Sequence, residues 1–247
     1  MNKELWNLDG KIAVVTGGSR GLGREMVLAF ARAGATVVIA SRKIEACEAV
    51  AAEVRATGGE AFAISVNASR WDAVEALSEA VYDRLGRIDI LVNNAGMSPA
   101  APSHEVTEAL FDKILALNFK GPFRLSSLVA QRMAQADGGV IINVSSAAAR
   151  RPSPQVVPYA AAKAALDAMT QSLAHEYAPK VRVNGISAGP FLTDIAMGWR
   201  DEDRVAQDNA LGRPGQPSEI VTSALFLATS ASSFVTGTVI RCDGGMH

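Results

Sequence analysis

The sequence of 247 residues predicts an α/β fold, in which a parallel sheet is wound on both faces by helices. Three observations indicate this class. Short, nearly continuous apolar segments recur along the chain, as expected for strands that are buried on both faces. Longer segments with the composition of helices separate them. The first apolar segment also runs directly into a glycine-rich turn and a helix. Repeated strand–helix–strand units imply parallel strands joined by right-handed crossovers.

The elements follow one another without a break that would mark a second domain. Strands are expected at Ile12–Thr16, Thr36–Ala40, Ala61–Val66, Ile88–Val92, Val140–Val144, Val181–Ile186 and Thr238–Arg241. The first three helices are expected at Leu22–Ala33, Ile44–Ala56 and Trp71–Leu85, because Gly34, Gly58-Gly59 and Gly86 follow them as stop signals. Two longer helices are expected near Ala109–Gln135 and Tyr159–Ala178.

Two irregular segments interrupt this pattern. Arg150–Pro158 contains three prolines and is expected to be a connecting loop. Phe191–Gly215 mixes charged residues with glycine and proline. Long irregular segments inside a compact domain often cover a functional site, so we expect this one to be a lid over the substrate.

Composition excludes several classes of function. The formal net charge is −1, which gives no global basic field for nucleic acid or an anionic membrane. No segment approaches the roughly 18–20 apolar residues of a membrane span, and the N-terminal residues lack the pattern of a signal peptide. The two cysteines lie far apart in sequence, and the three histidines lack metal-ligand spacing. We therefore expect a single cytoplasmic domain without a metal.

The glycine-rich turn Thr16–Gly23 predicts a dinucleotide site, because it follows the first strand and opens a helix. Gly17 permits a tight turn, Gly21 allows the backbone to approach a pyrophosphate, and Gly23 allows the helix to pack closely. The N-terminus of the helix then presents free N–H groups and the positive end of its dipole to the phosphates. The alternative is a glycine turn that serves packing alone.

The end of the second strand indicates which nicotinamide cofactor is bound. An acidic residue there would bind the 2′-hydroxyl of NAD, but the strand ends in Ser41-Arg42-Lys43, and no carboxylate precedes Glu45. Arg42, joined by Arg20 of the glycine turn, is suited to pair with the 2′-phosphate of NADP. The sequence therefore predicts NADP(H) rather than NAD(H). In the alternative interpretation, Arg42 is only a solvated charge near the start of a helix.

A tyrosine and a lysine, Tyr159 and Lys163, are spaced to share one face of a helix. The ordinary pKa of tyrosine is about 10, too high for efficient proton transfer near neutral pH. An adjacent ammonium favours the phenolate and is expected to lower that pKa. Pro158 precedes the pair and is tolerated in a first helical turn.

With these motifs in place, the chain resembles the short-chain dehydrogenase/reductase family over about residues 8 to 245. The resemblance rests on the glycine turn, Asn93–Gly96, Ser145-Ser146, the Tyr159/Lys163 pair, Gly189-Pro190 and Thr193. It implies a Rossmann-type sheet of about seven strands in the order 3-2-1-4-5-6-7. It also implies hydride transfer between a nicotinamide cofactor and a secondary alcohol or ketone.

The resemblance implies a role for each of four catalytic residues. Tyr159 is expected to exchange a proton with the substrate oxygen, and Ser146 to hydrogen-bond that oxygen. Lys163 is expected to lower the Tyr159 pKa and hold the nicotinamide ribose, and Asn118 to position a water that links Lys163 to solvent. The residues expected to contact the cofactor are Gly17, Ser19, Arg20, Gly21, Leu22, Gly23, Ser41, Arg42, Asn67, Ala68, Asn94, Ala95, Gly96, Tyr159, Lys163, Ile186, Gly189, Pro190 and Thr193.

Several assignments have structural competitors. Ser145 is an alternative to Ser146, although the 13-residue spacing to Tyr159 favours Ser146. Asn118 is alternatively a helix residue that bonds the backbone, and Thr193 a cap of the next helix. Asn93 is expected to tie neighbouring strand ends together. Many relatives would have aspartate at the position of Asn67, whose side-chain carbonyl oxygen is still able to contact adenine.

The substrate and the assembly are less constrained by sequence. The expected partner is a small carbonyl or alcohol, and an acyl-carrier-protein thioester is the alternative substrate. Such an acidic carrier requires basic residues near the pocket, and Lys180 and Arg182 supply some positive charge. The alternative of another class is a non-catalytic NADP-binding module. The resemblance implies a homotetramer that pairs the two long helices, with Ala160, Ala164 and Ala168 permitting close approach.

Overall fold

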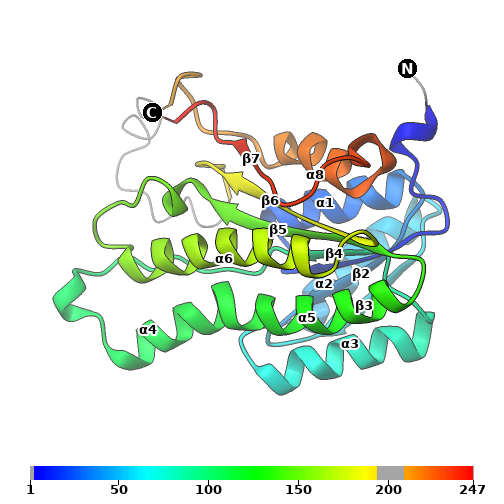
Figure 1. Ribbon diagram of the computed structural model, residues 1–247, viewed down its shortest axis with the longest axis horizontal. Helices are drawn as coiled ribbons and strands as arrows, with labels where there is room; N and C mark the ends of the chain where they lie inside the picture. The colour runs from blue at the N-terminus through cyan, green and yellow to red at the C-terminus, as the bar shows by residue number, and fades with distance from the viewer. Residues whose placement is uncertain (1–2, 194–208, 247) are drawn as a thin grey trace.

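The computed structural model describes residues 3–193 and 209–246. Its centre is one sheet of seven parallel strands in the order β3-β2-β1-β4-β5-β6-β7, which confirms the expected fold (Figure 1). The strands are β1 (Ile12–Thr16), β2 (Thr36–Ser41), β3 (Ala61–Ser65), β4 (Ile90–Asn93), β5 (Gly139–Ser146), β6 (Val181–Ala188) and β7 (Val239–Cys242). The order reverses between β1 and β4, and a parallel sheet binds ligands beyond the carboxyl ends of the strands at such a point.

The helices match the expected positions with two local differences. They are α1 (Gly21–Arg32), α2 (Ile44–Ala56), α3 (Trp71–Leu85), α4 (Glu108–Leu115), α5 (Gly121–Gln135), α6 (Val157–Glu176) and α8 (Val221–Ala228). The helix expected near Ala109–Gln135 is α4 and α5, joined by a π-helical turn at Ala116–Lys120. Helix α6 begins at Val157, so Pro158 lies in its first turn and not in the preceding loop.

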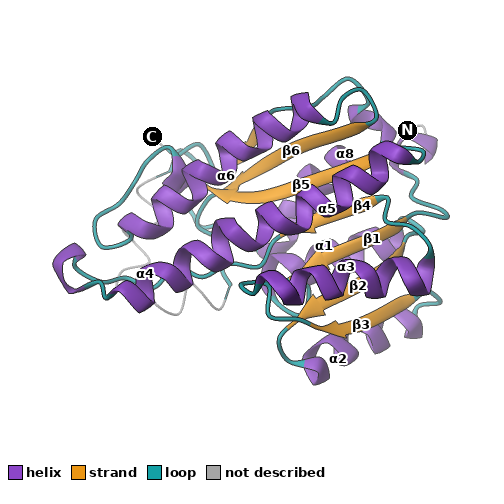
Figure 2. Ribbon diagram, turned by 60° about the horizontal axis from the view of Figure 1, so that its bottom comes forward, coloured by secondary structure: helices purple, strands orange, loops and turns teal. Residues whose placement is uncertain are grey.

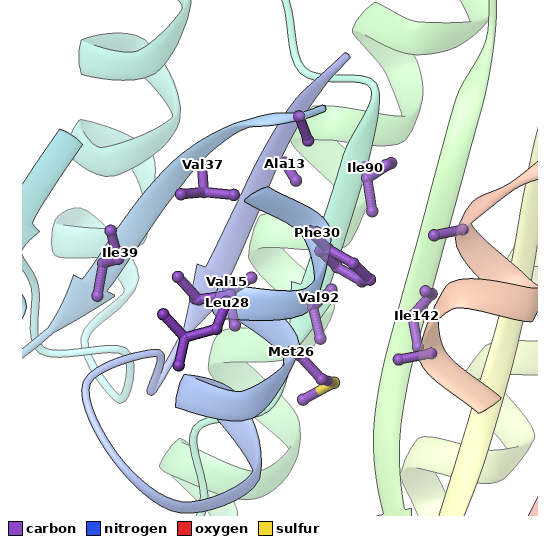
Figure 3. Close-up of a cluster of buried hydrophobic side chains, with 14 of the residues drawn as sticks. Ala13, Val15, Met26, Leu28, Phe30, Val37, Ile39, Ile90, Val92 and Ile142 are labelled. Atoms are coloured by element: carbon purple, nitrogen blue, oxygen red, sulfur yellow. The ribbon is translucent and has the colours of Figure 1, made fainter. Parts of the chain in front are cut away.

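Helices cover both faces of the sheet. One apolar cluster packs α1, α2 and α8 against one face, and a second packs α3, α5 and α6 against the other (Figure 2). Alternation along β1 separates the two clusters, since Ala13 and Val15 face α1 while Val14 faces the other side. Figure 3 shows Met26 and Phe30 of α1 lying over the strands, and both side chains are fully buried.

A chain of buried polar side chains ties the second face to the sheet. The Asn93 amide nitrogen donates to Asn143 Oδ1 at 2.8 Å and to Ser126 Oγ at 2.8 Å. The Asn143 amide nitrogen in turn donates to Thr170 Oγ1 of α6 at 2.9 Å. These bonds fix the carboxyl ends of β4 and β5 relative to α5 and α6. They agree with the structural role expected for Asn93.

Candidate active site

The glycine turn is built by close contacts between its own backbone and the loop after β4. Gly17 has a φ of +66°, and a Cβ added to it would lie 2.9 Å from the Asn94 amide nitrogen. A Cβ on Gly23 would lie only 2.3 Å from the Gly17 carbonyl oxygen. Helix α1 begins at Gly21, so the last residues of the glycine-rich segment form its first turn. This arrangement leaves a cradle of backbone that only glycine permits, with the helix N-terminus facing it.

Asn94 and Thr16 hold this turn in place. The Asn94 amide nitrogen donates to the carbonyl oxygens of Thr16 at 3.0 Å and Gly17 at 3.2 Å. Thr16 Oγ1 accepts the backbone N–H groups of Asn94 and Ala95, and donates to the Val92 carbonyl oxygen. The amide nitrogen of Asn94 is thus used to shape the cofactor cradle, a supporting function that the sequence did not reveal.

The end of β2 presents hydroxyl groups and positive charge beside the turn. Ser19 Oγ of the turn and Ser41 Oγ of β2 lie 2.8 Å apart. The side chains of Arg20 and Arg42, which follow these two serines in sequence, are exposed. The first acidic residue of this segment, Glu45, lies in the first turn of α2. Arg20 and Arg42, which we predicted around a 2′-phosphate, therefore flank a pair of hydroxyl groups at the end of β2, and their contact with that phosphate stays a prediction.

The loop after β3, where we expect the adenine contact, is held by hydrogen bonds within its own turn. Asn67 Oδ1 accepts hydrogen bonds from the backbone N–H of Ser69 at 3.2 Å and from Ser69 Oγ at 2.8 Å. The oxygen that we assigned to adenine is therefore engaged in its own turn. The Ala68 carbonyl oxygen lies so close to Gly121 that an added Cβ there would approach it to 1.8 Å. Ala68 thus anchors the loop to the start of α5.

Ser146, Tyr159 and Lys163 meet at the carboxyl end of β5. Ser146 is the last residue of β5, and its hydroxyl is hydrogen-bonded to the Tyr159 phenol in the first turn of α6. Ser145 is buried and lies instead 3.5 Å from the Lys163 carbonyl oxygen. Adjacent residues of a strand point to opposite sides, so only one serine is able to face Tyr159. The structure places Ser146 there and not Ser145.

The pKa of Tyr159 differs from the expectation. Burial raises the pKa of the Tyr159 phenol, and the hydrogen bond with Ser146 opposes that rise. The lowering that we expected from Lys163 is not found. The Lys163 ammonium donates to the Val144 carbonyl oxygen at 2.7 Å and lies 5.8 Å from the centre of the Tyr159 ring. Burial also lowers the pKa of Lys163 to about 8, while Asp167 raises it.

Asn118 lies in the π-helical turn between α4 and α5 and is fully buried. Its amide nitrogen donates to the carbonyl oxygens of Met97 at 2.9 Å and Ile114 at 3.0 Å. The position of a Cβ on Gly96 lies 2.9 Å from Asn118 Oδ1 and 3.7 Å from Lys163 Nζ. Asn118 and Lys163 therefore approach the same glycine. The side chain of Asn118 also bonds the backbone, as in the alternative interpretation.

The segment after β6 closes the other side of the cradle. The Gly189 N–H donates to the Cys242 carbonyl oxygen at 2.9 Å, and a Cβ on Gly189 would lie 2.5 Å from Asp243 Cα. Thr193 is the nearest neighbour of Gly21, since a Cβ on that glycine would lie 3.4 Å from Thr193 Cγ2. The glycine turn and the predicted nicotinamide end thus face each other.

The end of β6 and the two ends of the expected lid lie close together in the described part of the chain. Ile186 is fully buried within the core cluster of the α1 face, and its contact with the nicotinamide end stays a prediction. It supports the end of β6 from within the core. The lid boundaries are defined by a bridge between Phe191 and Gly215, and Pro190 accepts the Gly215 N–H at 2.8 Å. Residues 194–208 of the expected lid lie outside the described residues.

Residues 3–193 and 209–246 contain neither a helix able to span a membrane nor a cluster of side chains able to hold a metal ion. Among the described residues, no helix combines the length and apolar character needed to cross a membrane. The same residues contain no group of three or more histidine, cysteine, aspartate or glutamate side chains arranged to hold a metal ion.

The comparisons identify the family. The model of the short chain dehydrogenase family matches residues 11–204. The chain belongs to this family. It is 36% identical over 248 residues to the 7alpha-hydroxysteroid dehydrogenase of Escherichia coli K12, covering 99% of this chain and 97% of that protein. This protein is therefore an oxidoreductase of a family that acts on small molecules.

Solved structures of relatives contain either form of the cofactor. A 7alpha-hydroxysteroid dehydrogenase complexed with NADH and 7-oxo glycochenodeoxycholic acid has a TM-score of 0.95 and 36% identity, covering 100% of this chain and 98% of the other. A gluconate 5-dehydrogenase from Burkholderia cenocepacia in complex with NADP and tartrate has a TM-score of 0.94 and 32% identity, covering 99% and 98%. These structures support a nicotinamide cofactor for this short-chain dehydrogenase.

Proposed function

We propose that this short-chain dehydrogenase transfers a hydride between NADP(H) and a secondary alcohol or ketone, with Tyr159 as general acid and base. The observation that carries the proposal is the contact of the Tyr159 phenol with the Ser146 hydroxyl at the carboxyl end of β5. Lys163 lies one helical turn further along α6 and is 4% exposed. All three groups lie on the edge of the sheet that carries the glycine turn.

In the reduction of a carbonyl, Tyr159 acts as the proton donor. Its phenol carries a proton at neutral pH, and that proton is the one that a nascent alkoxide requires. The Ser146 hydroxyl donates to the same substrate oxygen and stabilises its developing negative charge. The nicotinamide supplies or accepts the hydride when it is bound. Lys163 holds the cofactor ribose, and Asn118 positions a water through which protons reach Lys163.

The preference for NADP(H) rests on the end of β2. A 2′-phosphate requires hydrogen-bond donors and positive charge, and the paired Ser19 and Ser41 hydroxyls lie next to Arg20 and Arg42. A 2′-hydroxyl would be bound best by a carboxylate at this strand end, where the sequence places Ser41-Arg42-Lys43. We therefore propose NADP(H) as the cofactor, with the phosphate between the two serines and Arg42.

Calorimetric titration with NADPH and NADH tests the cofactor assignment. The wild type is expected to bind NADPH at least tenfold more tightly than NADH, and Arg42→Ala to lose about tenfold or more in NADPH affinity, the effect of one charge-assisted hydrogen bond. Lys43→Ala is the matched control, since it removes the neighbouring exposed charge. Equal binding of NADH, unaffected by Arg42→Ala, would overturn the NADP assignment. Failure to bind either cofactor would overturn both the dehydrogenase proposal and the NADP-binding module.

The substrate proposal stays at the level of a small carbonyl compound or secondary alcohol. Lys180 and Arg182, the basic residues that could attract an acidic carrier protein, form hydrogen bonds within the fold. The Arg182 guanidinium donates to Ser232 Oγ and to backbone carbonyl oxygens, and Lys180 Nζ donates to the Ala136 carbonyl oxygen at 2.8 Å. This disfavours the acyl-carrier-protein thioester. Reduction of a ketone panel by wild type, abolished in Tyr159→Phe, would support the proposal, and a preference for acetoacetyl thioesters would favour the alternative.

The quaternary structure and cellular location remain predictions. A pocket of about 510 Å³ between α4 and the start of α6 is lined by Phe111 and Val157, both exposed. Such apolar surface supports pairing of these helices between subunits. Ala160 is buried within the subunit, whereas Ala164 and Ala168 are exposed. Light scattering of wild type and Phe111→Asp tests the tetramer, and the location is expected to be cytoplasmic.

A further inference from the structure

A half-buried carboxyl group, that of Asp167, lies behind the proposed catalytic lysine and is not used by the mechanism above. Asp167 follows Lys163 by four residues on α6, so the two side chains lie on one face of the helix, one turn apart. Asp167 Oδ1 is buried and has no hydrogen-bond partner among the described residues. A buried, unpaired carboxylate oxygen is costly, and its presence beside a functional group calls for a physical explanation.

The Ser145 hydroxyl connects this carboxyl group to the catalytic helix. It lies 3.5 Å from the Lys163 carbonyl oxygen, and it also hydrogen-bonds the Asp167 side chain. One hydroxyl has a single proton to donate, and a carboxylate is a stronger acceptor than a backbone carbonyl. Ser145 therefore orients the Asp167 carboxyl group, and its hydrogen bond opposes the rise in the pKa of that group. This gives the first serine of the Ser145-Ser146 pair a function on the side opposite Tyr159.

The charged and titratable groups around Lys163 are few in the described part of the chain. From α6 itself, Tyr159 lies on one side and Asp167 on the other. From β5 the ammonium meets only the Val144 carbonyl oxygen, and from the loop after β5 Arg150 acts on Asp167. Asp167 is therefore the acidic group whose charge acts on Lys163. Burial raises the pKa of Asp167, while Ser145, Arg150 and Lys163 oppose that rise.

We propose that Asp167 is a positioning residue that keeps the buried Lys163 side chain protonated, and that Ser145 holds the carboxylate for this purpose. Asp167 does not touch the reacting atoms and forms no direct ion pair with the lysine; its charge acts through one helical turn of buried structure. The inference rests on the proposed function, in which a charged Lys163 binds the cofactor ribose.

The expected size of the effect follows from the electrostatics of a partly buried site. Burial already lowers the pKa of Lys163 to about 8, so its charge is sensitive in the working pH range. Loss of a neighbouring carboxylate at an effective dielectric constant of about 20 to 40 shifts a pKa by roughly one pH unit at this range of separation. The same shift would leave only about a tenth of Lys163 charged at pH 8, a loss of about fivefold.

Asp167→Asn is the decisive variant, because asparagine keeps the shape and removes the charge. Two controls accompany it. Asp167→Glu restores the charge, and Glu176→Gln removes an exposed negative charge from the same helix. The first readout is the NMR titration of the ¹³Cε resonance of Lys163 in cofactor-free enzyme labelled with [¹³C]lysine, assigned by its absence in Lys163→Met. The second is the pH profile of kcat/KM for NADPH-dependent ketone reduction.

The titration midpoint of Lys163 is expected to fall by about one pH unit in Asp167→Asn, to return towards the wild-type value in Asp167→Glu, and to stay unchanged in Glu176→Gln. The loss of kcat/KM at alkaline pH should shift by the same amount, with little change at pH 6.5. An unchanged Lys163 midpoint in a folded Asp167→Asn enzyme would overturn the proposal. If the wild type reduces no ketone, the proposed function fails, while the NMR titration still tests Asp167.

Discussion

Gly23 is the position where a single methyl group should separate cofactor binding from folding. A Cβ at this site would lie 2.3 Å from the Gly17 carbonyl oxygen and 2.4 Å from the Asn94 amide nitrogen. Real Cβ contacts are essentially never shorter than about 3 Å. Gly23→Ala must therefore displace either the first turn of α1 or the glycine turn by about half an ångström or more.

Overpacking and helix propensity act in opposite directions on the free energy of unfolding of Gly23→Ala. Overpacking a tight site costs roughly 1–3 kcal/mol, while alanine is favoured over glycine in a helix by up to about 1 kcal/mol. The net loss should be about 1–2 kcal/mol. Cofactor affinity should fall more steeply. Displacement of the turn misaligns backbone N–H donors to a phosphate, and one such charge-assisted bond contributes about 1.5–3 kcal/mol, or roughly 10- to 100-fold in affinity.

Urea unfolding and calorimetric titration with NADPH measure the two effects separately. Gly58→Ala is the control, because Gly58 has a φ of +84° and no atom within 4 Å of an added Cβ. It should lose a similar 1–2 kcal/mol through left-handed backbone strain alone, with unchanged NADPH affinity. A Gly23→Ala enzyme that binds NADPH within twofold of wild type would refute this account of the turn.

Three further predictions follow from buried groups. Arg182→Met should lower the free energy of unfolding by about 3 kcal/mol, because the guanidinium donates to four acceptors around Ser232 that would lose their partner; a loss below 1 kcal/mol in urea would contradict this. Phe30→Ala should cost about 3–5 kcal/mol by leaving a cavity in the fully buried core, and a loss below 2 kcal/mol would show that the site collapses. Lys163→Met should be more stable than wild type at pH 7 by about 2–3 kcal/mol, while abolishing activity. Equal stability of the two at pH 7 would show that the buried ammonium costs nothing.

The sign of the Lys163 prediction follows from its pKa of about 8 in the fold, against an ordinary value near 10.5. Between these values the unfolded chain binds more protons than the folded chain, so the stability of the wild type rises with pH in this window. The advantage of Lys163→Met should therefore be fully present below pH 8 and shrink as the pH approaches 10.5. Chemical unfolding at pH 7, 8 and 9 is sufficient to follow it.

Much of the fold was accessible from sequence because both faces of the sheet are covered. Strands buried on two sides must be apolar throughout, so β1 was predicted with the bounds that it has, Ile12–Thr16. The ends of β5 and β6 were not, since their pairing runs on to Ser146 and Ala188. These last residues are small or polar and lack a strand signature. They become strand only because a neighbouring strand supplies their hydrogen bonds.

The sequence was sufficient to propose which residues form the site, but not which contacts they make. The π-helical turn at Ala116–Lys120 was missed, because it depends on a buried Asn118 that bonds backbone carbonyl oxygens brought together by the fold. The choice between Ser145 and Ser146 rested on spacing, whereas strand alternation decides which one faces Tyr159. Asp167 carried one signal in the sequence, its four-residue distance from Lys163. Its significance appears only when burial is known.

The polar groups of α6 are of two kinds. Some hold the helix against the sheet through hydrogen bonds, and others lie at the proposed catalytic site. Thr170 belongs to a hydrogen-bonded chain through Asn143 to Asn93, whose bonds of 2.8–2.9 Å fix the helix against β4 and β5. About one and two turns earlier on α6, Asp167 Oδ1 has no hydrogen-bond partner among the described residues, and burial lowers the pKa of Lys163. The hydrogen-bonded chain can hold Asp167 and Lys163 in place because Thr170 lies on the same helix. A substitution that removes the buried Lys163 ammonium should therefore stabilise the fold and abolish activity. A substitution that breaks the hydrogen-bonded chain through Asn143 should lower both stability and activity.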